Sequence, residues 1–156
     1  GKLKKEKNKS IKRNKPIIDE ENSSKSNKIK KEMMKKVKDF QRNKEKEQEK
    51  EDRNKNVEKA LSLLKKAVEI EPDDAYIIDS LGWAFFLSDQ TDKSIFFLEK
   101  AVSILPDDAT LNDHLGDAYW KAGRQSEAKS QWKRVLILDP QFKKKNVINS
   151  KIKNGL

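Results

Sequence analysis

The stretch Pro72-Asp73-Asp74-Ala75 is repeated unchanged at Pro106-Asp107-Asp108-Ala109, 34 residues further along the chain. The pair Leu81-Gly82 recurs at Leu115-Gly116 with the same offset of 34, and Pro140 follows the second proline by 34 residues again. Two separate markers with one spacing indicate internal repeats, because a fixed period of about 20 to 50 residues is typical of stacked repeat proteins.

Apolar residues return every three or four positions within each repeat, which predicts amphipathic helices. Each proline lies where a helix must end, and the Asp-Asp pair after it can cap the N–H groups of the next helix. Gly82 and Gly116 fall inside expected helices, which indicates that a neighbouring backbone comes too close for a Cβ. The expected helices cover residues 57–71, 75–88, 92–104, 109–121, 125–138 and 143–153. The sequence therefore predicts an all-α solenoid.

Four features together resemble the tetratricopeptide repeat. They are the period of 34, the Leu-Gly pair, an aromatic residue three positions after the glycine (Phe85 and Tyr119), and the closing proline. This resemblance implies a solenoid of helical hairpins. It divides 57–156 into a half repeat at 57–74, full repeats at 75–108 and 109–142, and a capping helix at 143–156.

The chain departs from the family pattern at a few positions. Ile78 and Asn112 stand where the family prefers Trp, and Ser94 replaces a small Ala that Ala128 keeps. The segment 112–120, with Gly123-Arg124 and Gln131-Trp132 after it, resembles the last repeats of long bacterial tetratricopeptide proteins. The expected capping helix has one apolar stripe, made by Val147, Ile148, Ile152 and Leu156.

Positive charge is concentrated in the N-terminal tail. Residues 1–56 have 21 Lys or Arg against 11 Asp or Glu, a net charge of +10, whereas 57–156 has 15 of each. Residues 1–28 contain too few apolar side chains to offset chain entropy, so this basic low-complexity tail is expected to be mostly disordered. Ile29, Met33, Val37 and Phe40 predict an amphipathic helix at 29–40. Residues 41–56 have no apolar side chain and could form a solvated helix or a linker.

Catalytic chemistry has little support in the sequence. The chain has no Cys, a single His (His114), no glycine-rich phosphate loop and no nucleophile with a marked base. We therefore expect no enzyme activity, no cofactor and no metal site. No apolar run is long enough to span a membrane. The start at Gly1, without Met, indicates a fragment or a processed form; the cytoplasm is the default location, unless a longer parent chain has an export signal.

The family resemblance implies that the first helices of successive repeats line a concave groove that binds an extended or helical peptide. The groove would be aromatic and acidic, which favours a basic or amphipathic ligand and disfavours one held by its C-terminal carboxylate. The alternative that Trp83 and Trp120 pack between helices is left open. The residues implied for the groove are Tyr76, Asp79, Trp83, Phe86, Asp113, His114, Asp117, Trp120 and Lys121.

The first functional hypothesis is thus a noncatalytic scaffold that binds a peptide segment of a partner protein. The second is binding of nucleic acid or another anionic surface by the basic tail, with nucleic acid disfavoured because the tail contains no base-reading motif. A third is a truncated repeat protein with no activity of its own. The apolar faces at 29–40 and 57–71 could dock on each other or mediate self-association.

Overall fold

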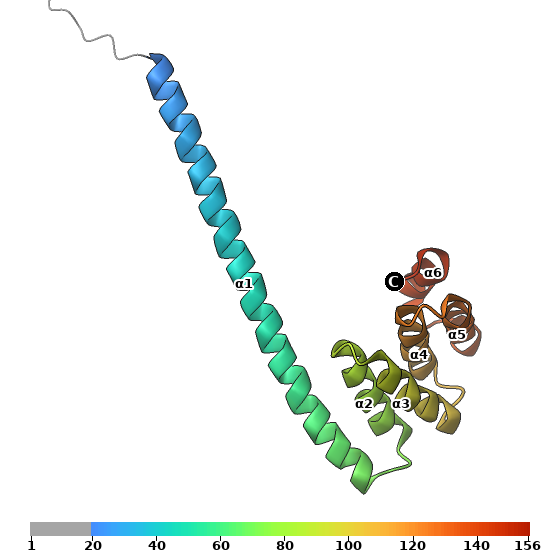
Figure 1. Cartoon of the computed structure of the whole chain (residues 1–156). Helices are drawn as coiled ribbons and strands as arrows, with labels where there is room; N and C mark the ends of the chain where they lie inside the picture. Colours follow the sequence, from blue (N-terminus) through green and yellow to red (C-terminus); the bar gives the residue numbers. More distant parts are fainter. Residues whose placement is uncertain (1–19) are drawn as a thin grey trace, which may run out of the picture. The chain divides into compact units, whose positions relative to one another are not determined.

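Helix boundaries in this protein follow its prolines and capping aspartates. The computed structural model describes residues 20–156, which form six helices (Figure 1). They are α1 (Glu20–Ile70), α2 (Ala75–Leu87), α3 (Thr91–Ile104), α4 (Ala109–Lys121), α5 (Gln125–Leu138) and α6 (Lys145–Asn154). The predicted all-α architecture is confirmed, and every helix expected after residue 74 is present within a few residues of its expected bounds.

Asp74 and Asp108 cap the two helices that begin the full repeats. The Asp74 carboxylate accepts hydrogen bonds from the backbone N–H groups of Tyr76 and Ile77 at 2.9 and 3.0 Å, and Asp108 accepts one from Leu111 at 3.0 Å. These bonds satisfy N–H groups that have no partner within the helix. The repeated Pro-Asp-Asp-Ala stretch therefore fixes where α2 and α4 begin.

Helix α1 is longer than the sequence predicted. Residues 20–28 were expected to be disordered but are helical. Residues 41–56, for which a solvated helix and a linker were both open, form a helix. The expected helix 57–71 is accordingly the last part of α1. No Gly or Pro occurs between residues 20 and 70, and Lys, Glu and Gln are good helix formers. The rest of the predicted disordered segment, 1–19, lies outside the described residues.

The described residues divide into two units, the first ending at Gln48 and the second covering Glu49–Leu156. The described residues of the first unit all belong to α1. The second unit contains the last part of α1 together with α2 to α6. The boundary predicted after residue 56 stays a prediction.

Helix pairs α2–α3 and α4–α5 pack as successive hairpins in the second unit, and α6 packs on α5 (Figure 1). The repeat markers Leu81, Leu115 and Tyr119 are all buried, and so is Ala101 of α3. The largest cluster runs through α3, α4, α5 and α6 around the fully buried Trp132. Leu61 of α1 packs with Leu81, Ala84 and Phe85 of α2. The predicted half repeat at 57–74 stays a prediction.

Two glycines allow the hairpins to close. A Cβ on Gly82 would lie 2.7 Å from Leu98 Cγ, and one on Gly116 would lie 2.5 Å from Trp132 Nε1. Both distances are shorter than a carbon atom tolerates, so each glycine marks a helix-helix contact, as predicted. The nearest atoms belong to side chains, however, and not to the backbone that the sequence pattern predicted.

Helix α6 covers the end of the stack with a narrower apolar face than expected. Ile148 is fully buried and Ile152 packs on the same cluster, but Val147 and Leu156 are 50% and 58% exposed. The predicted stripe is therefore wrong at its two outer positions, because only one turn of α6 reaches the core. Among the described residues, no helix has the length and apolar character needed to cross a membrane.

Candidate peptide-binding surface

The first helices of the two full repeats, α2 and α4, contact each other directly. We call the nine residues implied for the groove the α2–α4 surface; four come from α2 and five from α4. The structure brings most of them into contact, but through two different arrangements. One is an aromatic stack, and the other is a set of buried ion pairs.

The aromatic stack is centred on Trp83. Its ring lies parallel to that of Phe86, with centroids 4.5 Å apart, and stacks on the His114 ring from α4 at 4.4 Å. Lys121 Nζ lies 4.5 Å from the Phe86 ring centroid. Trp83, Phe86 and His114 are all half-buried. Each ring therefore has one part packed within the protein and another part in contact with solvent.

Asp79 holds the His114 ring in place. His114 Nδ1 lies 2.9 Å from both carboxylate oxygens of Asp79, and only 6% of Asp79 is exposed. An ionised carboxylate can only accept, so Nδ1 carries the proton. This contact joins α2 to α4 and orients the imidazole against Trp83.

The other two aspartates pair with a residue of the capping helix. Lys151 Nζ lies 2.9 Å from Asp113 Oδ1 and 2.8 Å from Asp117 Oδ1, and Trp132 Nε1 donates a hydrogen bond of 3.0 Å to Asp117. All three charged side chains are at most 12% exposed. The sequence reasoning missed Lys151 and Trp132. A usable signal was present, because Lys151 follows Asp117 by 34 residues and so occupies the equivalent position in the next repeat.

Burial and the neighbouring groups shift the pKa values of this cluster in opposite directions. Burial raises the pKa of Asp117, while hydrogen bonds from Lys151 and Trp132 oppose the rise. Burial lowers the pKa of Lys151, but its bonds to Asp117 and Asp113 outweigh that effect and leave the pKa above its ordinary value. Two carboxylates thus share one ammonium. Part of the negative charge expected from these aspartates is therefore compensated within the chain.

The remaining predicted positions differ in exposure. Trp120 is half-buried beside Trp132, and a Cβ at Gly155 would lie only 2.0 Å from its ring, so the end of α6 covers it. Tyr76 is 58% exposed, and its hydroxyl donates to Asp108 at 3.2 Å. Lys121 donates to the Phe86 carbonyl at 2.9 Å. Tyr76 is therefore exposed, whereas Trp83 and Trp120 are both half-buried and Trp120 packs against the main cluster.

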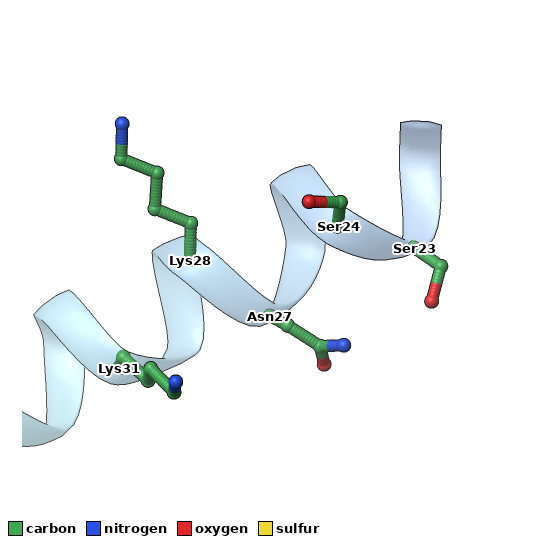
Figure 2. Close-up of a pocket in the computed structure, with 5 residues that line it drawn as sticks. All are labelled: Ser23, Ser24, Asn27, Lys28 and Lys31. Atoms are coloured by element: carbon green, nitrogen blue, oxygen red, sulfur yellow. The ribbon is translucent and has the colours of Figure 1, made fainter. Parts of the chain in front are cut away.

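A surface hollow near the start of α1 has no such organisation. Ser23, Ser24, Asn27, Lys28 and Lys31 line it, and their side chains point in different directions from a single helix (Figure 2). These described residues all come from one helix, so by themselves they cannot enclose a ligand. In residues 20–156, no three His, Cys, Asp or Glu side chains are grouped so that they could hold a metal ion.

Neither a family model nor a curated protein matches this chain. Several solved structures do. The tetratricopeptide domain of Arabidopsis OM64 aligns with a TM-score of 0.59 at 20% identity, over 65% of this chain and 84% of that one. The first tetratricopeptide domain of Spaghetti (RPAP3), bound to the HSP90 peptide SRMEEVD, aligns with a TM-score of 0.57 at 23% identity, over 67% and 86%.

The second tetratricopeptide domain of human RPAP3, in complex with the HSP70 peptide SGPTIEEVD, also aligns with a TM-score of 0.57, at 20% identity over 67% of this chain and 92% of that one. At such low identity these likenesses establish the fold. The chain has the tetratricopeptide-type fold of stacked helical hairpins, as the sequence pattern predicted. The narrower resemblance to bacterial proteins stays a prediction.

Proposed function

We propose that residues 49–156 form a noncatalytic module that binds a peptide segment of a partner protein across α2 and α4. The observation that carries this proposal is the half-buried stack of Phe86, Trp83 and His114. Large aromatic side chains fixed in one orientation are typical binding hot spots, because they bury much area at small cost in side-chain entropy. Two of the similar solved structures are complexes with peptides, which supports the same use of the fold here.

The ligand is an amphipathic peptide with an apolar anchor for Trp83. The aspartates have a smaller role than the sequence indicated, because Asp113 and Asp117 are paired with Lys151. Their cluster still has one more negative than positive charge, and this excess disfavours acidic peptides. A peptide such as SRMEEVD, which contains two Glu and one Asp, is therefore a poor ligand.

A display library of peptides, screened against the full chain, tests the proposal. We expect amphipathic peptides to be enriched and Trp83→Ala to weaken their binding about tenfold or more, since a central hot-spot residue is worth about 2 kcal/mol or more. The matched control is Phe96→Ala, which removes an aromatic side chain that is 64% exposed on α3. If no peptide is enriched, or if the two variants bind selected peptides equally, the proposal is wrong.

A further inference from the structure

The most exposed apolar stripe on a described helix lies in the first unit, outside the α2–α4 surface. Ile29, Met33, Val37 and Phe40 are 57%, 61%, 55% and 69% exposed, and none belongs to a hydrophobic cluster of the described residues. Each residue of an α-helix advances by about 100°, so these four side chains fall within an arc of about 80° on α1. Together they form a narrow apolar face of about three turns.

Basic residues surround this apolar face. Residues 25–44 contain nine Lys or Arg and two acidic residues, a net charge of +7. Of the two acidic side chains, Glu32 lies 3.7 Å from Lys36, and Asp39 pairs with Arg42. Lys30 and Lys36 lie about 20° beyond the two edges of the apolar face, by the same helical geometry. Lysines in these positions can bury their alkyl stems beside an apolar phase while the ammonium groups stay in a polar layer.

We infer that residues 25–44 of α1 bind an anionic phospholipid membrane, with the apolar face toward the acyl chains and the lysines toward the headgroups. A basic helix with one apolar face has the charge and shape complementarity that such an interface requires. Each Lys or Arg near an anionic leaflet adds to the attraction, so the charge of +7 supplies a large part of the affinity.

The apolar face distinguishes a membrane from a nucleic acid as the partner. A nucleic acid would bind the lysines but leave Ile29, Met33, Val37 and Phe40 in water. Binding of single strands also relies on aromatic stacking, and Phe40 is the one aromatic residue between 20 and 48. A lipid interface engages both the charge and the apolar side chains.

The first test is flotation of the full chain with two kinds of vesicle, one of phosphatidylcholine alone and one of equal parts phosphatidylcholine and phosphatidylglycerol. Binding should require phosphatidylglycerol and fall as salt is added. Met33→Gln should weaken it roughly fivefold to tenfold, because a buried apolar side chain is lost from the interface. Met34→Gln is the matched control. Met34 is 62% exposed, like Met33, but lies about 60° outside the apolar face.

A second readout uses the absence of Cys from the chain. Met33→Cys and Met34→Cys each give a single site for an environment-sensitive fluorophore. On phosphatidylglycerol vesicles the emission should shift to the blue for position 33 and much less for position 34. Circular dichroism of each variant verifies that α1 keeps its helix.

Three results would overturn the inference. One is equal binding to both kinds of vesicle, and another is an equal effect of the two methionine substitutions. The third is salt-sensitive binding to a single-stranded RNA, without vesicle binding, that Met33→Gln leaves unchanged; this result would assign the basic helix to nucleic acid. The α2–α4 surface takes no part in these measurements, so their failure leaves the proposed peptide binding unaffected.

Discussion

Replacing Lys151 with Met should destabilise the repeat unit much more than any other loss of a lysine from α6. The substitution keeps an unbranched apolar side chain but removes the ammonium that Asp113 and Asp117 share at 2.9 and 2.8 Å. The two carboxylates are only 4% and 9% exposed, so water cannot replace the lost partner well. Removing one member of a buried ion pair typically costs about 3 to 5 kcal/mol.

We expect the lower end of this range, about 3 kcal/mol, because Lys151 retains some contact with water. In a unit of this size each kcal/mol lowers the melting temperature by roughly 4 to 8 °C, so a fall of roughly 12 °C or more is expected. Tryptophan fluorescence is a suitable assay. All three Trp residues lie between positions 83 and 132, so the signal reports on the repeats and not on the first unit.

The loss of stability in Lys151→Met should become smaller as the pH falls. Without Lys151, burial and the neighbouring Asp113 both raise the pKa of Asp117 in the folded protein, above its ordinary value near 4 in the unfolded chain. The folded state then takes up a proton as pH falls, so its stability increases on acidification. The melting temperature of Lys151→Met should therefore recover part of the way toward that of the wild type as the pH falls from about 7 toward the ordinary carboxylate pKa near 4.

Lys153→Met is the control, since it removes the same charge from the same helix at an exposed position. Adding Asp117→Asn to Lys151→Met should restore part of the stability, because the amide oxygen can still accept from Trp132 while Asp113 stays without its ammonium partner. Equal melting temperatures for the two methionine variants at about pH 7, where carboxylates are ionised, would refute the account of the cluster.

Three further substitutions test the packing of the repeats, each by thermal unfolding followed through tryptophan fluorescence. Leu115→Ala should cost about 2 to 5 kcal/mol and abolish cooperative melting, whereas Leu63→Ala, at a side chain that is 68% exposed, should change little. Ser94→Ala should raise stability by about 1 kcal/mol, since the buried Ser94 hydroxyl has no hydrogen-bond partner. Gly116→Ala should lower stability by about 1 to 3 kcal/mol, although Ala has the better helix propensity, because the new Cβ meets the buried Trp132 ring. A stabilised variant would contradict this packing.

The helices of the two full repeats could be predicted from the sequence because the signals that define them are local. A capping aspartate such as Asp74 accepts hydrogen bonds from N–H groups two or three residues away. A glycine inside a helix, such as Gly116, indicates that a neighbouring group lies too close for a Cβ. The continuity of α1 was harder to predict. Its middle segment lacks both apolar periodicity and helix breakers, and this combination does not distinguish a solvated helix from a linker.

The sequence predicted which helices contain the candidate site residues, but not how the side chains are arranged. The family resemblance placed Asp113 and Asp117 on the correct helix, yet their exposure depends on where α6 lies, and sequence spacing alone does not give that position. Lys151 and Gly155 act through this tertiary contact, one by charge and one by covering Trp120. Asp113 and Asp117 are consequently paired within the chain, whereas the Trp83 stack stays half-buried.

Hydrogen exchange on the full chain, with and without a library-selected peptide, tests the central claim most directly. If the peptide lies across the aromatic stack, protection should increase at residues 75–87 and 109–121, which form α2 and α4. The second helices of the hairpins, α3 and α5, should change much less. Protection confined to α3 and α5, or to the exposed helix of the first unit, would contradict peptide binding at the α2–α4 surface.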